Sequence, residues 1–313
     1  MPIKYITMNA ISLLILLNFY SCKKDQAADS TVKKYTALTQ KIVDSSTVIV
    51  HVFSDTSFQV CPGVEETDIN YYNKKGLSTS AFILKVDLKN PAVDLRAATP
   101  FDLGTLGTLQ TVTAMAGYVD GPNKRVMAGL NGDFYNTTTN IPQGIVYKNG
   151  VAVKPAYSDN TDKPQQGLSF FAILKNGAPF IGDRETDYPA MKTQLKEALG
   201  GGVFLVKDYA LMPQSIPTVT ARTCIGFTSD NVVYFVEVDG GNFYYSNGIN
   251  YQELGEMIKA LGVKDAINID GGGSSTLMIK HPLANVWQIR NKPQDGDPRA
   301  IATSWLIIDK SKP

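Results

Sequence analysis

Three acidic residues follow apolar runs at points where the chain turns on glycine. Asp270 lies in the segment INIDGGGSST, Asp239 in EVDGGN and Asp133 in NGDFY. An acidic residue beside glycine is by itself most often a turn residue. Three of them at the ends of apolar runs provide the carboxylates that glycosyl transfer uses as acid, base or nucleophile. The alternative is that they bind a hard cation such as Ca²⁺ or Mg²⁺, for which carboxylates are the preferred ligands.

Three glycines and three hydroxyl residues follow Asp270 directly. Glycine adopts the φ > 0 angles at which successive amides converge on an anion, and serine hydroxyls add donors. The segment is not a P-loop, because it has no GK[ST] pair and the residues LMI after it are typical of a strand. A glycine-rich hairpin with surface hydroxyls is the alternative. The acidic residue beside the glycines favours a site for a phosphate or carboxylate group.

Arg222 begins the apolar run RTCIGF. Period-2 alternation places Arg222, Cys224 and Gly226 on one face of a strand. A guanidinium can hold a phosphate through two hydrogen bonds, although a lone arginine more often forms a surface ion pair. Cys224 has no evident base, and the chain has only two histidines, His51 and His281, and no CxxC pair. Carboxylates must therefore carry any acid–base chemistry, and no cofactor is expected.

These side chains need a sheet to position them, and β-branched and aromatic runs predict one. We expect strands at 47–53, 81–88, 125–130, 144–147, 168–174, 203–206, 222–227, 232–238, 265–269, 276–279 and 301–308. Helices are expected over 250–261, where Asn250 and Glu253 can form a capping box, and over 108–116 and 190–199. This pattern predicts an α+β fold, with a mixed, mostly antiparallel sheet and a few flanking helices in a single main domain. The order of strand 232–238, helix 250–261 and strand 265–269 allows one parallel pair of strands.

The N-terminal residues predict an exported protein. Lys4 precedes an apolar run that is far shorter than the roughly 20 residues that span a bilayer, and Ser21 before Cys22 resembles a bacterial lipobox. A plain cleaved signal is the alternative. The expected divisions are an export signal over 1–21, a polar tether over 22–46, N-terminal strands over 47–125 packed on the main domain, and the main domain itself over 126–313. The expected location is the bacterial cell envelope, on its periplasmic face or the cell surface, with a lipid on Cys22 as the membrane anchor.

The charge balance excludes a nucleic-acid footprint. Without residues 1–21 the chain loses only Lys4 of its 30 basic residues, so 29 basic residues face 29 acidic ones. If Cys22 carries lipid, Cys61 and Cys224 remain as a candidate disulfide in an oxidising compartment. The sequence does not show whether the two are close in space.

At the motifs quoted above the chain resembles the phosphodiester glycosidase family. The resemblance covers about 126–308 and also includes QGIVYKNG at 143–150 and the closing DPRAIATSWLII. The long block from VEVDGGN to IDGGGSST is highly specific. The resemblance implies an enzyme that hydrolyses the C1–O bond of a sugar-1-phosphodiester and has a glycan or sugar-phosphate substrate.

The resemblance also implies a set of pocket residues. They are Asn131, Asp133, Arg222, Thr223, Asp239, Asp270, Gly271, Gly272, Ser274, Ser275 and Arg299. Two positions depart from the family pattern, since Gly241 stands where arginine is frequent and Cys224 where alanine is usual. The first departure bears on recognition of the leaving group.

We hypothesise that Arg222 and the amides of 271–275 hold the phosphate. Asp270 or Asp239 then acts as nucleophile or water-activating base, and Asp133 positions sugar hydroxyls or supplies the second carboxylate. Two alternatives stay open: a non-catalytic lipoprotein that binds anionic glycans, and a metal-dependent phosphodiesterase that cuts the P–O bond.

Overall fold

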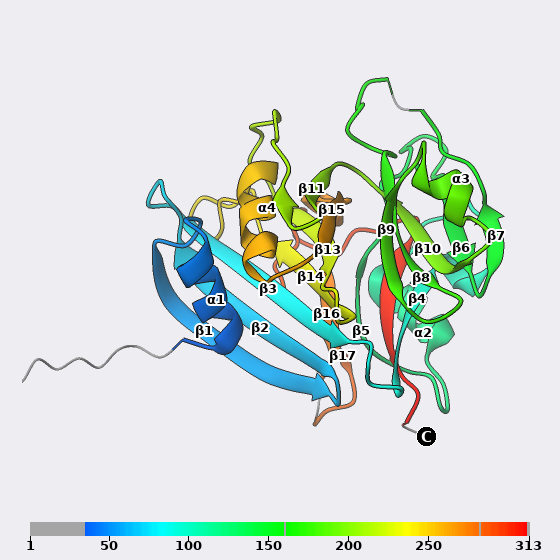
Figure 1. Ribbon diagram of the computed structural model, residues 1–313. Coiled ribbons are helices and arrows are strands. Elements are labelled where there is room, and N and C mark those ends of the chain that lie inside the picture. Colours follow the sequence, from blue (N-terminus) through cyan, green and yellow to red (C-terminus); the bar gives the residue numbers. More distant parts are fainter. Residues whose placement is uncertain (1–34, 160, 282, 312–313) are drawn as a thin grey trace, which may run out of the picture. The chain divides into compact units, whose positions relative to one another are not determined.

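An eight-stranded sheet forms the first layer of the computed structural model, which describes residues 35–159, 161–281 and 283–311 (Figure 1). The predicted export signal and Cys22 lie outside the described residues. The strand order is β1 (His51–Cys61), β2 (Val64–Tyr72), β3 (Ser78–Asp87), β14 (Val232–Val238), β13 (Arg222–Phe227), β15 (Asp265–Ile269), β11 (Phe204–Lys207) and β12 (Ala210–Leu211). In the described part of the chain, no helix has the length and apolar character needed to cross a membrane.

Two five-stranded sheets complete the fold. One has the order β7 (Val151–Lys154), β6 (Val146–Lys148), β10 (Leu195–Gly201), β8 (Ser169–Leu174) and β9 (Pro179–Asp183). The other has the order β17 (Trp287–Ile289), β16 (Leu277–Lys280), β5 (Arg125–Asn131), β18 (Ser304–Asp309) and β4 (Val93–Ala98). The helices are α1 (Ala37–Ser45), α2 (Val112–Val119), α3 (Asp187–Met191) and α4 (Tyr251–Ala260), with 3-10 turns η1 (Pro100–Asp102) and η2 (Gly272–Ser274).

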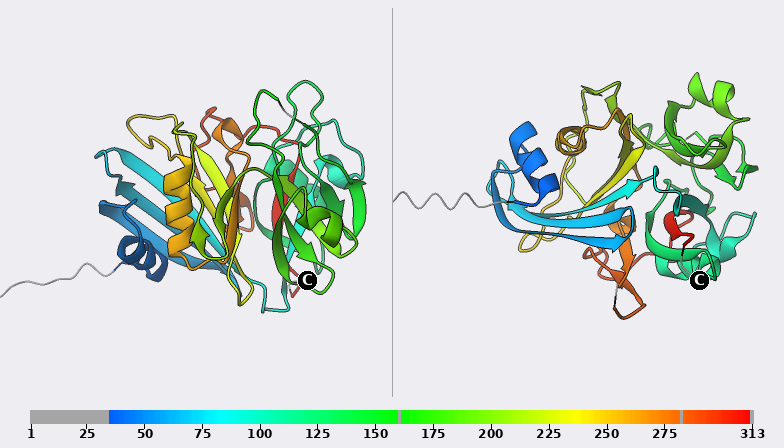
Figure 2. Two further views of the ribbon diagram at one scale, coloured as in Figure 1. Left: turned by 45° about the horizontal axis from the view of Figure 1, so that its top comes forward. Right: turned by 60° about the horizontal axis from the view of Figure 1, so that its bottom comes forward.

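The central strands of the eight-stranded sheet, β3, β14, β13 and β15, are buried on both faces, and their residues alternate between two cores. In β14, Val232, Tyr234 and Val236 pack with residues of α1 and α4, whereas Val233 and Phe235 pack against the two five-stranded sheets. Figure 2 shows α1 and α4 on one side of this sheet and the five-stranded sheets on the other. The side of the strand on which a residue falls therefore decides which core or site it faces.

An aromatic cluster joins the three sheets. Phe171 of β8 contacts Trp305 of β18 edge to face, with ring centroids 5.0 Å apart, and Phe235 of β14 at 6.4 Å. All three rings are buried. Each sheet contributes one ring, so the cluster fixes the sheets against one another.

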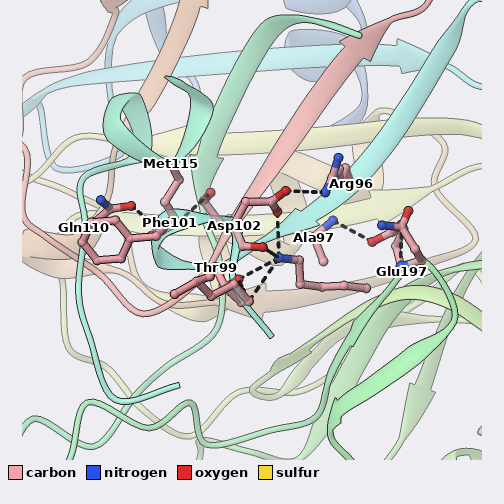
Figure 3. Close-up of polar contacts among 12 residues, drawn as sticks. Arg96, Ala97, Thr99, Phe101, Asp102, Gln110, Met115 and Glu197 are labelled. Carbon is pink, nitrogen blue, oxygen red and sulfur yellow. Dashed lines mark hydrogen bonds and ion pairs between the residues drawn. The ribbon is translucent and has the colours of Figure 1, made fainter. Parts of the chain in front are cut away.

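Polar contacts also tie the two five-stranded sheets together (Figure 3). Glu197 of β10 accepts a hydrogen bond from the amide of Ala97 in β4 at 3.2 Å. Asp102 binds Arg96 and Lys148, each at 2.7 Å. Because these groups are largely buried, the network holds β4 against β6 and β10.

The α+β fold class is confirmed, with antiparallel pairing throughout the described strands. The parallel pair that the order of 232–238 and 265–269 allowed does not form, because β13 lies between β14 and β15. The helix expected over 250–261 is α4, and its capping box of Asn250 and Glu253 is present. The helix expected over 108–116 begins later, at Val112, with Thr111 as its N-cap.

The helix expected over 190–199 is wrong. Most of that segment belongs to β10, which lies between β6 and β8, and the short α3 ends at Met191. Pairing with strands distant in sequence overrides the local amphipathic pattern here. The glycines that follow allow close approach, since a β-carbon on Gly200 would lie 2.5 Å from the Asp133 carboxylate.

The N-terminal part of the fold begins earlier than expected. The tether predicted over 22–46 lies outside the described residues up to residue 34, but its end forms α1, because Leu38 and Ile42 are buried against the large sheet. The N-terminal strands pair directly with strands of the predicted main domain, since β3 pairs along β14 and β4 along β18, and the described residues from Tyr35 onward form one unit.

The candidate disulfide is absent. Cys61 and Cys224 are both buried and do not form a disulfide with each other. Cys61 belongs to the core between the sheets, whereas Cys224 belongs to the core under α4. Four strand positions separate β1 from β13, so the two sulfur atoms lie on different strands and different faces.

Candidate active site

The ends of β15 and β5 meet at the site, although the two strands belong to different sheets. The Asp270 amide donates to the carbonyl of Gly132 at 3.1 Å. The Asn131 side chain donates to the Asp270 carbonyl at 2.6 Å. Backbone contacts between two sheets therefore fix the position of Asp270.

A pocket of about 270 Å³ opens beside Asp270. Its walls come from the ends of β13 and β15, the first turn of α4 and two connecting segments. The lining residues are Phe134, Lys163, Gln165, Gln166, Ile216, Thr218, Thr220, Arg222, Tyr251, Asp270, Gly271 and Gly272. The pocket thus combines one carboxylate with two cations and two aromatic rings.

The Arg222 guanidinium lies over the ring of Tyr251, with its carbon 3.9 Å from the ring centroid. One terminal nitrogen donates to the carbonyl of Thr218 at 3.0 Å, and Nε is buried with no hydrogen-bond partner among the described residues. Burial lowers the pKa of Arg222, while Tyr251 and Asp270 oppose that effect. The guanidinium is thus held between Tyr251 and Thr218 and retains a donor without a partner.

Asp270 is half-buried at the pocket wall. Burial raises its pKa to about 6, against the stabilising effects of the Ser274 hydroxyl, the Gly271 amide at 2.8 Å, and the charges of Arg299 and Lys163. Because the desolvation is only partly offset, Asp270 is a carboxylate that ionises close to neutral pH. Such a group can act as base or nucleophile.

The amides of the glycine turn mostly serve the turn itself. Gly271 donates to Asp270, Gly272 to the Ala221 carbonyl, and Ser274 and Ser275 to the carbonyls of Gly271 and Gly272. Only the Gly273 amide donates to no acceptor among the described residues. The predicted cradle of several converging amides is therefore wrong, because Gly272 at φ 61° folds the segment into a closed 3-10 turn.

Asn131, Thr223 and Ser275 were expected to contact substrate but lie under the turn, fully buried. The Thr223 hydroxyl donates to the Asn131 side-chain oxygen at 3.1 Å and contacts the Ser275 hydroxyl at 3.2 Å. The amide of Thr276 also donates to Asn131, at 3.2 Å. This network fixes the glycine turn from beneath. Alternation along β13 explains it, because Thr223 faces the opposite side from Arg222.

Asp133 is buried near Asp270 and does not line the pocket. Its Oδ2 accepts from the Gly144 amide at 2.6 Å, and its Oδ1 has no partner among the described residues. Burial raises the pKa of Asp133 to about 7, with the charge of Asp270 adding to the rise and that of Lys154 opposing it. Burial therefore raises the pKa of both acids toward neutral pH.

Asp239 lies outside the pocket. Its two oxygens accept from the Asn291 side chain at 3.0 Å and from the Lys292 amide at 2.7 Å. It continues the face of β14 that points away from Arg222, which is why it does not join the other two acids. Glu237 is buried next to it, and burial together with the charge of Asp239 raises the pKa of Glu237. Through its hydrogen bonds with Asn291 and Lys292, Asp239 anchors the segment 291–299.

Segment 291–299 brings Arg299 to the glycine turn. Arg299 contacts the Ser274 hydroxyl at 3.4 Å and forms an ion pair with Asp295 at 2.6 Å. Arg299 is thus near Asp270, but neither it nor Ser274 lines the pocket that contains Arg222.

Several residues that line the pocket were not among the predicted site residues. Tyr251 directly follows the helix cap Asn250, so its position at the end of the sheet could have been predicted from the capping box. No comparable local pattern indicated Lys163 or Phe134.

In the described part of the chain, no group of three or more His, Cys, Asp and Glu side chains is arranged to hold a metal ion. Of the three acids predicted to converge, only Asp133 and Asp270 lie near each other.

Residues 124–308 match the phosphodiester glycosidase family. The chain belongs to this family of hydrolases. The match covers the site described above, from β5 through Asp270 to β18.

Curated relatives match over shorter stretches. The N-acetylglucosamine-1-phosphodiester alpha-N-acetylglucosaminidase of Bos taurus is 34% identical over 113 residues, which are 36% of this chain and 18% of that protein. The Homo sapiens protein of the same name is 27% identical over 113 residues, or 36% of this chain and 19% of that protein. The uncharacterized prophage-derived protein YomE of Bacillus subtilis is 24% identical over 206 residues, or 63% and 29%. The matched stretches thus span less than a third of each relative.

Solved structures share the fold. The catalytic domain of the zebrafish N-acetylglucosamine-1-phosphodiester alpha-N-acetylglucosaminidase, auto-inhibited by its pro-peptide, matches with a TM-score of 0.61 and 19% identity over 81% of this chain and 87% of that chain. A hypothetical protein from Synechocystis matches with a TM-score of 0.58 and 11% identity over 82% and 64%.

The structure shows the surroundings of Gly241 and Cys224, the two positions of this phosphodiester glycosidase chain that depart from the family pattern. Gly241 has φ 75°, and a β-carbon there would lie 2.7 Å from the side chain of Gln294. Gln294 in turn accepts from the hydroxyl of Thr220 at 2.9 Å, at the pocket wall. Cys224 is buried beneath α4, and burial raises its pKa.

Proposed function

We propose that this protein hydrolyses the C1–O bond of a sugar-1-phosphodiester and releases free sugar and a phosphomonoester. The observation that carries the proposal is the pairing, in one pocket, of Asp270 with the cations Arg222 and Lys163. A phosphodiester beside a sugar ring needs a cationic group for the phosphate and a carboxylate for the anomeric carbon. Family membership supports the reaction class.

In this mechanism the phosphate lies against Arg222 and Lys163. The departing phosphate is already a weak base, so protonation by a general acid contributes less than stabilisation of its charge. Arg222 is suited to this task because Tyr251 and the Thr218 carbonyl hold its guanidinium in place. The interaction of these cations with the phosphate then stabilises the negative charge that develops as the C1–O bond breaks.

Asp270 serves as the nucleophile or as the base that activates water. Its pKa of about 6 leaves it mostly ionised at pH 7. Asp133 is the second carboxyl, and burial together with the charge of Asp270 raises its pKa. We assign Asp133 to positioning and tuning of Asp270, since it is buried away from the pocket.

The test is turnover on a panel of sugar-1-phosphodiesters, with detection of free sugar and phosphomonoester. In water labelled with oxygen-18, cleavage of C1–O places the label in the sugar, whereas cleavage of P–O places it in the phosphate. Binding without turnover on every panel member would favour the non-catalytic glycan-binding alternative. Label in the phosphate, with loss of activity on chelation, would favour the metal-dependent phosphodiesterase.

We further propose that the protein works in the bacterial cell envelope, anchored by a lipid on Cys22. The proposal rests on the apolar run and Ser21-Cys22 in the sequence. Incorporation of labelled fatty acid and recovery in the membrane fraction are expected for the full chain. Cys22→Ser should abolish both, and an unchanged distribution would refute the anchor.

A further inference from the structure

Asn268 is a fully buried polar residue of β15, two positions before Asp270. It lies opposite Cys224 on β13, so alternation places Asn268 and Asp270 on the same face of the sheet as Arg222. Burying an amide side chain costs free energy unless its two donors and its oxygen find hydrogen-bond partners. The partners of Asn268 therefore identify its task.

The Asn268 side chain is bonded at both of its polar atoms. Its oxygen accepts from the amide of Val203 at 2.7 Å. Its nitrogen donates to the Tyr251 hydroxyl at 3.1 Å and to the carbonyl of Ile269 at 3.3 Å. The backbone is bonded as well, from the Asn268 amide to the Val203 carbonyl at 3.1 Å and from the Gly202 amide to the Asn268 carbonyl at 2.9 Å. Asn268 is thus fixed by its backbone and by three side-chain hydrogen bonds.

The chain passes very close to the Asn268 side chain at Gly202. A β-carbon on Gly202 would lie 2.5 Å from the Asn268 side-chain oxygen, which is closer than two such atoms can approach. Glycine at this position therefore allows the segment before β11 to pack directly on the amide group.

Tyr251 connects Asn268 to the pocket. Its hydroxyl accepts from Asn268, and the Arg222 guanidinium carbon lies 3.9 Å from its ring centroid. Tyr251 and Arg222 line the pocket, whereas Asn268 does not. A hydrogen bond at the hydroxyl end limits the tilt of the ring, and the position of the ring sets where a cation over its face lies. A buried amide is therefore coupled to a pocket cation through one aromatic side chain.

We propose that Asn268 is a positioning residue for phosphate binding, and that it acts through Tyr251 to hold the Arg222 guanidinium where a phosphate in the pocket can bind it. The hydrogen bond to the Ile269 carbonyl also fixes the peptide that leads into Asp270. One buried side chain thus supports both the cation and the carboxylate of the pocket. The role of Arg222 as a phosphate ligand rests on the proposed function, but a binding measurement tests the positioning without turnover.

The experiment measures the dissociation constant of inorganic phosphate by calorimetry on the full-length protein. Tyr251→Phe keeps the ring and removes only the group that Asn268 binds, so phosphate should bind about three- to tenfold more weakly. In an Arg222→Lys background, Tyr251→Phe should change the affinity by less than about twofold, because an ammonium on a flexible stem does not depend on the ring in the same way. A residue that merely stabilised the fold would weaken binding equally in both backgrounds.

Tyr147→Phe is the matched control. Tyr147 is also buried, its hydroxyl lies 3.1 Å from that of Tyr188, and it does not line the pocket. This variant should leave the phosphate affinity unchanged. Asn268→Ala removes the other partner of the hydrogen bond, so adding Tyr251→Phe to it should weaken binding no further. Urea unfolding checks that each variant is folded, and Tyr251→Phe alone decides the matter if Asn268→Ala does not fold.

Equal phosphate affinities in wild type and Tyr251→Phe would overturn the proposal, as would an equal loss in both Arg222 backgrounds or in Tyr147→Phe. Absence of phosphate binding by the wild-type protein would overturn it too. Weaker binding by Tyr251→Phe, confined to the protein with Arg222 and found without turnover on any sugar-1-phosphodiester, would support the positioning role while refuting the proposed reaction.

Discussion

Asp270→Asn should make the protein more stable at neutral pH while removing its activity. Burial raises the pKa of Asp270 from its ordinary value of 3.8 to about 6. A carboxyl whose pKa is higher in the folded state favours folding below its unfolded pKa, and that contribution is lost as the pH rises through the folded pKa. Wild type therefore carries a penalty at pH 8 that asparagine, which does not ionise, avoids.

The size of the penalty follows from the difference between the two pKa values, about two pH units. At about 1.4 kcal/mol for each unit, ionising Asp270 in the folded protein costs about 3 kcal/mol. Asparagine keeps an oxygen that can accept from the Gly271 amide, so the turn should survive. Between pH 4 and pH 8 the stability of Asp270→Asn relative to wild type should rise by about 2–3 kcal/mol.

Urea unfolding of wild type and Asp270→Asn at pH 4 and pH 8 measures this change, and the melting temperature should shift by about 5 °C in the same direction. Turnover should fall by at least about 100-fold at both pH values. Asp297→Asn, an exposed carboxylate, should change neither quantity. If the stability difference between Asp270→Asn and wild type is the same at pH 4 and pH 8, then burial does not control the ionisation of Asp270, and the argument fails.

Three further predictions concern the site and the core. Arg222→Lys should raise KM about tenfold in steady-state kinetics with little loss of stability, because lysine lacks the planar group that stacks on Tyr251. Asn131→Ala should lower the free energy of unfolding by about 2–4 kcal/mol in urea titrations, since it leaves a buried hydroxyl, amide and carbonyl without their partner; a change under 1 kcal/mol would contradict the role assigned to the network. Cys61 and Cys224 should both resist a thiol reagent in the native protein and react after unfolding, and a failure of either to react after unfolding would contradict the absence of a disulfide between them.

Local sequence signals predicted the parts of the site that depend on short-range structure. The helix α4 could be predicted because its cap, its box and its apolar spacing lie within a dozen residues. Asp270 with its glycines and Arg222 on its strand could be identified because each follows or begins a strongly apolar run. The sequence by itself thus determined which side chains are available for chemistry and that the fold is α+β.

Only the tertiary structure decided which of those side chains meet. Asp239 and Asp270 both follow a strand and precede glycines, but the pairing of β13 with β14 and β15 turns Asp239 and Thr223 to the face of the sheet opposite Arg222 and Asp270. Residues 195–199 became a strand because β6 and β8, distant in sequence, offer partners on both sides. The physical reason is common to both cases: a strand gains its hydrogen bonds and buries its side chains against segments far away along the chain, so the face that each residue presents is set by pairing that no local pattern records.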